Sequence, residues 1–156
     1  MKSLTLFRHA KTERESSTGR DFDRRLNERG RKDAPRIGEE LRKLDLEFDL
    51  VLSSPAARAA ETAQLAGLSP RFDQRIYDAS AGELLAIAQQ ADNQVERLMM
   101  VGHNPGFDRL ASRLVGSNVE MPTGSVIEIE LPVDDWSDAG DGDGKQVRFL
   151  KPKELP

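Results

Sequence analysis

Short apolar runs alternate with helical patterns along the first two thirds of the chain. Three runs, at residues 3–7, 49–53 and 98–101, have the length of buried strands, and residues 71–73 are expected to form a further short strand. The segments between them space apolar residues as helices do, and a further helix is expected over residues 107–115. This alternation predicts helices packed on a largely parallel sheet.

Local signals set the expected ends of the first helix. Asn27 is predicted to cap it, with Asp33 as a later alternative, because Pro35 would remove one hydrogen bond from the longer helix. The apolar positions then fall on one face of the helix. They are Ala34, Ile37, Leu41 and Leu44.

Two further helices carry start signals. Pro55 is expected in the first turn of a helix that runs to Ala66, before Gly67 stops it. Ser80 and Glu83 match a capping box, which predicts a helix over residues 81–90.

The last third of the chain has a different pattern. Residues 126–131 alternate with a period of two, and residues 145–150 are expected to pair with them antiparallel across a turn at 138–144. That Asp/Gly-rich turn lacks the glutamate of a calcium loop, so we expect no calcium site there. Residues 151–156 are expected to form a loose tail.

Composition limits the setting. With 156 residues, 37% of them hydrophobic, the chain is expected to fold as one domain spanning residues 1–156. A net charge of -4 argues against nucleic-acid and membrane-surface partners, which need a basic face. The absence of cysteine excludes disulfides and thiolate metal sites. Because no apolar leader precedes the first strand, we expect a cytoplasmic protein.

Both histidines of the chain follow predicted strands. His9 follows Arg8 at the end of the first apolar run, and His103 follows Gly102 at the end of a later one. Doubly wound sheets place their ligand sites at such strand exits. We therefore expect the two imidazoles to meet in one crevice.

Arginines at the same kind of position predict an anion site. Arg8 and Arg58 would supply forked guanidiniums that match phosphate oxygens, and the helix that opens at Pro55 would add free backbone donors. A neutral imidazole among these cations, His9 or His103, could attack phosphorus in line, with no metal needed. The four side chains together predict a pocket for a phosphate dianion.

Each of these residues also has a purely structural reading. A single histidine beside a strand is more often a core residue than a catalyst, and Arg58 could simply pair with Glu61 on its own helix. The run at residues 21–25 reads most simply as a solvated loop. The joint pattern, and not any single residue, favours a site.

Four blocks of sequence resemble the histidine phosphatase superfamily, closest to its phosphohistidine phosphatases of the SixA type. The blocks are Arg8-His9-Ala10-Lys11, Asp21-Phe22-Asp23-Arg24-Arg25-Leu26-Asn27 with Gly30, Ser53-Ser54-Pro55 with Arg58-Ala59 and Thr62, and Gly102-His103-Asn104-Pro105. The resemblance spans nearly the whole chain. It implies the phosphoglycerate-mutase-like fold, a three-layer α/β/α sandwich with a mostly parallel central sheet and an antiparallel C-terminal edge hairpin.

The resemblance also implies residue roles. His9 would be the phosphorylated nucleophile, Arg8 and Arg58 would clamp the phosphate, and His103 would stabilise the transferring group, without any cofactor. Ala10 stands where the family pattern has glycine, and Arg25 stands where it has proline. Neither departure removes a catalytic group.

A general acid and the rim of the pocket are further candidates. Relatives carry a carboxylate after the helix of the second arginine, and Asp78 falls near the corresponding place; Glu83 competes but already has its capping role. Lys11 and Arg24 are candidates to flank the substrate entrance.

Several function classes stay open. The first is a phosphatase acting on phosphohistidine in a protein partner, since so short a chain has little room for a lid over small substrates. The second is a small-molecule phosphomonoesterase or mutase of the same fold. A non-catalytic phosphate or phosphoprotein-binding module would need Arg8 and Arg58 but not His9. A metallohydrolase has less support, because no carboxylates are spaced with the two histidines in a familiar ligand motif.

Overall fold

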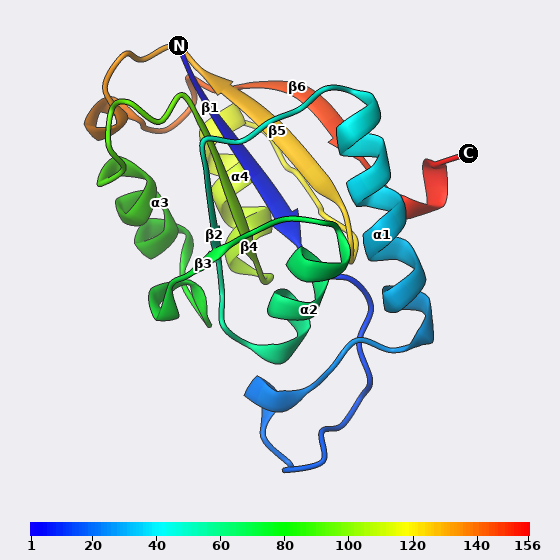
Figure 1. The fold of residues 1–156 in the computed structure, drawn as a ribbon. Helices are drawn as coiled ribbons and strands as arrows, with labels where there is room; N and C mark the ends of the chain where they lie inside the picture. The colour runs from blue at the N-terminus through cyan, green and yellow to red at the C-terminus, as the bar shows by residue number, and fades with distance from the viewer.

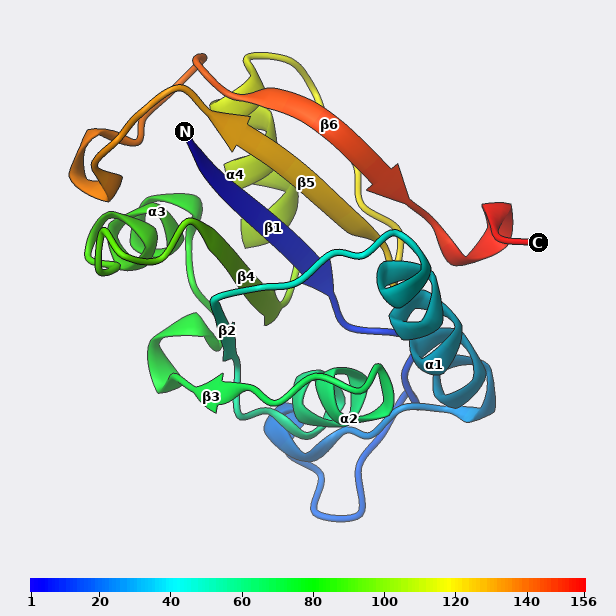
Figure 2. The same cartoon turned by 45° about the horizontal axis from the view of Figure 1, so that its top comes forward.

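The computed structural model describes residues 1–156 as a six-stranded sheet between two pairs of helices (Figure 1). The strands are β1 (Lys2–Arg8), β2 (Leu50–Ser53), β3 (Arg71–Phe72), β4 (Arg97–Gly102), β5 (Val126–Leu131) and β6 (Lys145–Leu150). The helices are α1 (Glu28–Lys43), α2 (Ala57–Leu65), α3 (Ala81–Gln89) and α4 (Gly106–Val115). Helices α1 and α2 cover one face of the sheet, and α3 and α4 cover the other (Figure 2). The predicted three-layer α/β/α sandwich is confirmed.

The strand order is β3-β2-β4-β1-β5-β6. The first four strands of this order pair in parallel, whereas β5 and β6 pair antiparallel at one edge, as expected for the C-terminal hairpin. Side chains alternate between the faces, so that Leu6 and Met100 join the apolar cluster under α3 and α4 while Phe7 and Val101 join the one under α1 and α2. Because both faces are covered, β1 and β4 read as continuous apolar runs.

Helix α1 begins where the cap predicts. The Asn27 side chain accepts a hydrogen bond from the Gly30 amide at 2.9 Å, which fixes the longer of the two expected helices. Pro35 lies within this helix, and Asp33 is not a cap but a buried ion-pair partner of Arg29. The capping box of Ser80 and Glu83 at α3 is also present, so the predicted caps of Asn27 and of Ser80 are both confirmed.

Helix α2 starts later than expected. It begins at Ala57, and Pro55 lies before the helix rather than in its first turn. The Ser54 hydroxyl accepts a hydrogen bond from the Ala56 amide at 3.2 Å, which gives this donor a partner before the helix begins.

The prediction of a loose tail at residues 151–156 was wrong. Pro152–Glu154 form a turn of 3-10 helix, and Pro152 is buried. The Leu155 carbonyl accepts a hydrogen bond from Arg36 on α1, and the Leu155 side chain packs against the apolar cluster under that helix. An apolar residue and a nearby helix give the segment its contacts, which composition alone did not reveal.

The register of the central strands aligns the ends that carry the candidate site. Strand β4 lies between β1 and β2, and its Gly102 pairs with Arg8 while its Val101 pairs with Ser53. The residues that follow these strand ends therefore leave the sheet side by side.

None of the helices is both long and apolar enough to cross a membrane.

Candidate active site

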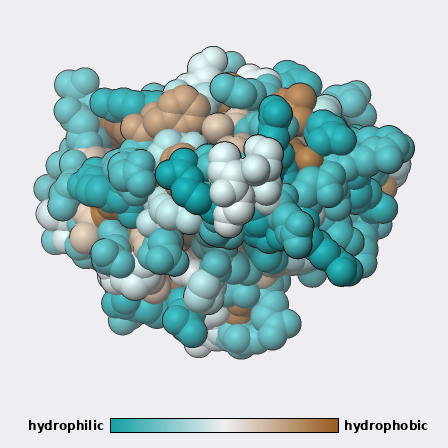
Figure 3. Space-filling view, turned by 90° about the horizontal axis from the view of Figure 1, so that it is seen from below, coloured by the Kyte–Doolittle hydropathy of each residue, from teal (hydrophilic) through white to brown (hydrophobic).

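A cavity of about 330 Å³ opens at the C-terminal ends of β1, β2 and β4. Figure 3 looks onto this end of the molecule, where hydrophilic side chains dominate the surface. The lining includes every residue predicted to contact the phosphate, namely Arg8, His9, Arg58 and His103. Hollows of about 500 and 520 Å³ lie elsewhere, beside β2 and β3, but neither contains a histidine.

His9 is buried and presents one free ring nitrogen. Its Nδ1 lies 2.8 Å from the Ala10 carbonyl oxygen; because a carbonyl can only accept, Nδ1 carries the hydrogen in the neutral ring. Nε2 is then left with its lone pair. Burial, together with the charges of Arg58 and Arg8, lowers the pKa of His9 to about 4, although the bond to Ala10 opposes this shift. His9 is therefore uncharged at neutral pH.

His103 lies against His9, with ring centroids 5.3 Å apart. Its Nε2 is 2.8 Å from the Ser54 hydroxyl, and its Nδ1 is buried without a hydrogen-bond partner. Burial, followed by the neighbouring His9 and Arg58, lowers the pKa of His103 to about 3. Gly102 lets the chain pass here, since a Cβ would lie 2.8 Å from the Phe107 ring.

Arg58 is held by a segment that sequence patterns read as a solvated loop. Asp21 lies in a turn of 3-10 helix, Asp21–Asp23, and accepts from Arg58 twice, through its carbonyl at 2.8 Å and its carboxylate at 2.9 Å. Tyr77 donates to the same carboxylate at 2.9 Å. Burial raises the pKa of Asp21, but the bonds from Tyr77 and Arg58 outweigh it and hold that pKa below its ordinary value. The structural alternative in which Arg58 pairs with Glu61 is not observed; Glu61 instead accepts from the Leu26 amide.

Arg8 and Arg24 bring two more guanidiniums to the cavity. Arg8 donates to the Met121 carbonyl at 2.7 Å, and burial lowers its pKa. Arg24 approaches Asp21 at 3.2 Å as an ion pair. Thr62 ties the scaffold together, because its hydroxyl donates to the Arg58 carbonyl and accepts from the Ala10 amide.

The cavity concentrates donors that the protein itself leaves unpaired. Five buried side-chain polar atoms in the chain have no hydrogen-bond partner, and four of them belong to residues that line this cavity. Three of these are the Nε atoms of Arg8 and Arg58 and the Nδ1 of His103; the fourth, Nε of Arg24, forms no hydrogen bond but lies 3.2 Å from the Asp21 carboxylate as an ion pair. Buried donors without partners are costly, so a cluster of them indicates a site built for an anion.

The remaining candidates divide. Asp78 lines the cavity, is exposed, and has a left-handed backbone with φ of 56°. Glu83 stays in its capping box, where the Ser80 amide lowers its pKa, and does not line the cavity. Arg24 lies in the lining, whereas Lys11 is exposed and outside it. The structure contains no group of three or more His, Cys, Asp or Glu side chains placed to hold a metal ion.

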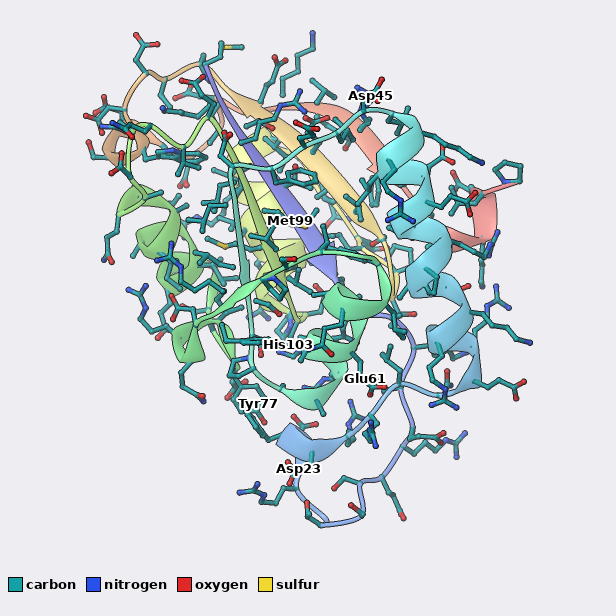
Figure 4. The ribbon with its side chains drawn as sticks, viewed as in Figure 1. Asp23, Asp45, Glu61, Tyr77, Met99 and His103 are labelled. Atoms are coloured by element: carbon teal, nitrogen blue, oxygen red, sulfur yellow. The ribbon has the colours of Figure 1, made fainter.

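Sequence reasoning missed two side chains of the site, Asp21 and Tyr77. Asp21 stands in a block that was noted for its resemblance but was not assigned a role, and Tyr77 has no local signal. Figure 4 shows Tyr77 beside His103, and their rings meet edge to face at 5.6 Å. These contacts join segments far apart in sequence, which spacing cannot indicate.

The sequence of the chain matches a known protein family and several related proteins. The family model of the histidine phosphatase superfamily (branch 1) matches residues 4–119. An uncharacterised protein of Mycobacterium leprae is 30% identical over 114 residues, covering 72% of this chain and 71% of that protein.

Two solved structures share the fold over nearly the whole chain. The provisionally named phosphohistidine phosphatase SixA of Agrobacterium tumefaciens is 27% identical, with a TM-score of 0.81 over 97% of this chain and 98% of the other. Its provisionally named counterpart from Nakamurella multipartitia is 24% identical, with a TM-score of 0.85 over 97% and 96% of the two chains. The latter likeness is one of fold.

Proposed function

The chain belongs to the histidine phosphatase superfamily, and we propose that it hydrolyses phosphohistidine in a protein partner through a covalent intermediate on His9. The observation that carries the proposal is the set of three buried donor nitrogens without any partner, Nε of Arg8, Nε of Arg58 and Nδ1 of His103, around one neutral imidazole. Donors in this number suit the oxygens of a phosphoryl group, and the free Nε2 of His9 suits attack on its phosphorus.

Two transfers make up the proposed reaction. The Nε2 lone pair of His9 forms a bond to phosphorus while the bond from phosphorus to the substrate imidazole breaks, and that imidazole, already protonated on its other ring nitrogen, leaves as the neutral ring. Water then attacks the phosphorus of phospho-His9, its two protons leave with the product as dihydrogen phosphate, and the Nε2 lone pair is restored. Arg8 and Arg58 would neutralise the phosphoryl oxygens in both transition states.

Two features support a phosphohistidine substrate on a protein. A protonated phosphoramidate nitrogen leaves readily, so the reaction makes little demand on Asp78, an exposed carboxylate without a hydrogen-bond partner. The cavity opens at an end of the molecule whose surface is mostly hydrophilic (Figure 3), which a folded partner can approach. The similarity to the Agrobacterium protein is consistent with this substrate.

A small phosphate ester is the second candidate substrate, and one observation favours it. Asp78 lies in the cavity wall, where it could protonate the leaving oxygen of an ester. Esters need such a proton because an alkoxide is a poor leaving group.

A substrate panel tests the proposal. The purified protein is incubated with several phosphorylated histidine domains, with phosphoserine, with sugar phosphates and with an aryl phosphate, each with and without chelator. We expect rapid, chelator-insensitive loss of phosphate from the histidine domains and slower hydrolysis of the esters. Faster hydrolysis of sugar phosphates would select the small-molecule alternative, and tight phosphate binding without turnover would indicate a binding module.

A further inference from the structure

Ser54 connects the strand end of β2 to His103. The side chain of Ser54 is fully buried, and its Oγ lies 2.8 Å from His103 Nε2. The same Oγ accepts a hydrogen bond from the Ala56 amide at 3.2 Å. No other contact of the hydroxyl is a hydrogen bond, so its hydrogen has one available acceptor, the His103 ring.

The hydrogen bonds available to Ser54 Oγ and His103 Nε2 determine which of the two atoms is the donor. If His103 carried its hydrogen on Nε2, two hydrogens would compete at one contact, and the buried Ser54 hydroxyl would lose its only acceptor. An unsatisfied buried donor is expensive. If Nε2 keeps its lone pair, the hydroxyl donates to it and every group at the contact is satisfied. The hydrogen of the neutral ring then sits on Nδ1.

We infer that Ser54 is a positioning residue that holds His103 as the Nδ1–H tautomer, so that His103 acts as a neutral hydrogen-bond donor to the transferring phosphoryl group. The inference rests on the proposed phosphatase function. It explains why Nδ1 is buried without a protein partner while His103 lines the cavity. A phosphoryl oxygen would supply the acceptor.

This assignment gives the two histidines opposite tasks from the same tautomer. The Ala10 carbonyl accepts from Nδ1 of His9 and leaves a lone pair on the other nitrogen. The Ser54 hydroxyl donates to the lone pair on Nε2 of His103, so the free nitrogen of that ring, Nδ1, carries the hydrogen. One ring therefore offers an electron pair and its neighbour, 5.3 Å away, offers a hydrogen. In this tautomer His103 offers no free lone pair that could act as a base beside His9, and because the ring is neutral it adds no positive charge to those of the arginines.

Nitrogen NMR of the histidine side chains tests the tautomer directly. The chain has only two histidines, so comparison with the His9→Ala variant assigns the signals of His103. We expect a protonated Nδ1 and an unprotonated Nε2 in the free protein. In Ser54→Ala, which lacks the donor, we expect the Nε2–H tautomer to become populated. A protonated Nε2 in the parent protein, or an unchanged spectrum in Ser54→Ala, would overturn the inference.

Kinetics and a matched control separate positioning from packing. Ser53 is also fully buried, and its hydroxyl donates to the Ser54 carbonyl without touching a histidine. We expect Ser54→Ala to lower kcat on a phosphorylated histidine domain by roughly 10-fold or more with a small change in KM. Ser53→Ala should leave the His103 spectrum unchanged and alter kcat less. Equal losses in both variants, with no tautomer change in either, would mean that the turn and not the hydroxyl matters.

A third arm keeps this inference distinct from the proposed function. Ser54→Thr retains the hydroxyl, and a residue before proline prefers extended backbone, which β-branched residues adopt readily, so its spectrum should match the parent. Inorganic phosphate added to the free protein should shift the Nδ1–H signal of His103. If no substrate is turned over but the tautomer and this shift are as expected, the phosphatase proposal fails and the role of Ser54 stands.

Discussion

Two buried groups of charged residues lie at opposite ends of the sheet, and they are satisfied in different ways. At the N-terminal end of β1, Glu128 is 4% exposed and accepts hydrogen bonds from Ser3 and Arg148, each at 3.2 Å. At the other end, Arg8, Arg58 and their neighbours keep donor nitrogens without partners. Both groups are polar and buried, but the buried charged side chain of the first has its hydrogen-bond partners, whereas the buried arginines of the second keep donors without one.

The difference separates structural from functional polarity. A buried carboxylate that meets its partners within the protein is satisfied by the fold, and weakening one of those contacts destabilises the fold. Donors that the fold leaves unpaired are a cost to stability, which a bound anion can offset. Substitutions at the two ends should therefore have opposite signatures, with activity lost at one end and stability at the other.

The largest effect is expected at the nucleophile. His9→Ala should abolish turnover and acid-labile phosphate labelling of the protein, because no other group can replace the attacking nitrogen. The fold should survive, since the ring faces a polar cavity rather than the apolar core. Labelling from a phosphorylated histidine domain and circular dichroism measure the two expectations. Retained turnover would reject the covalent mechanism.

A guanidinium tested at each end sharpens the contrast. Arg58→Lys keeps a charge but loses the fork that donates twice to Asp21 and the Nε that the proposed function assigns to the phosphate, so kcat/KM should fall by roughly 10²-fold or more. Arg148→Lys makes the same change in the pair with Glu128 and should leave kcat/KM near the parent value. Steady-state kinetics of both variants compare them. A parent rate for Arg58→Lys would remove this arginine from the mechanism.

The substrate decides the size of the effect at Asp78. Asn tolerates the left-handed backbone there, so Asp78→Asn removes the acid without strain. We expect a loss of roughly 10²-fold on alkyl phosphates and a much smaller one on phosphohistidine, because only an alkoxide needs the proton. Glu83→Gln is the matched comparison and should alter neither rate much. Equal losses on both substrates would sink the leaving-group role of Asp78.

The smallest effect is expected at the satisfied end. Glu128→Gln leaves Arg148 and Ser3 with a weaker acceptor, which should lower the free energy of unfolding by about 2 kcal/mol, an amount moderated by the partial exposure of the arginine. Turnover at saturating substrate should not change. Urea unfolding and kcat measure the two quantities, and a loss of activity without a loss of stability would reverse the comparison.

The sequence predicted the residues that local patterns mark. Apolar runs in the sequence predict the buried strands. Asn27 and Ser80 predict helix starts because their side chains accept hydrogen bonds from amides three residues away. Strand exits then indicated His9 and His103. Contacts across long separations carry no such signature: Asp21 meets Tyr77 at a sequence distance of 56 residues. The same reason explains the misread tail, whose partner is α1.

The backbone around the site continues the hydrogen-bond ladder of the sheet. The His9 amide donates to the Gly102 carbonyl at 3.0 Å, the His9 carbonyl accepts from Gly124 at 2.8 Å, and the Ser54 amide donates to Val101 at 2.9 Å. In terms of hydrogen exchange, these amides should open only when the central strands separate. The candidate catalytic groups are thus expected to share the slowest-opening part of the molecule, and local fraying of surface loops should leave their spacing unchanged.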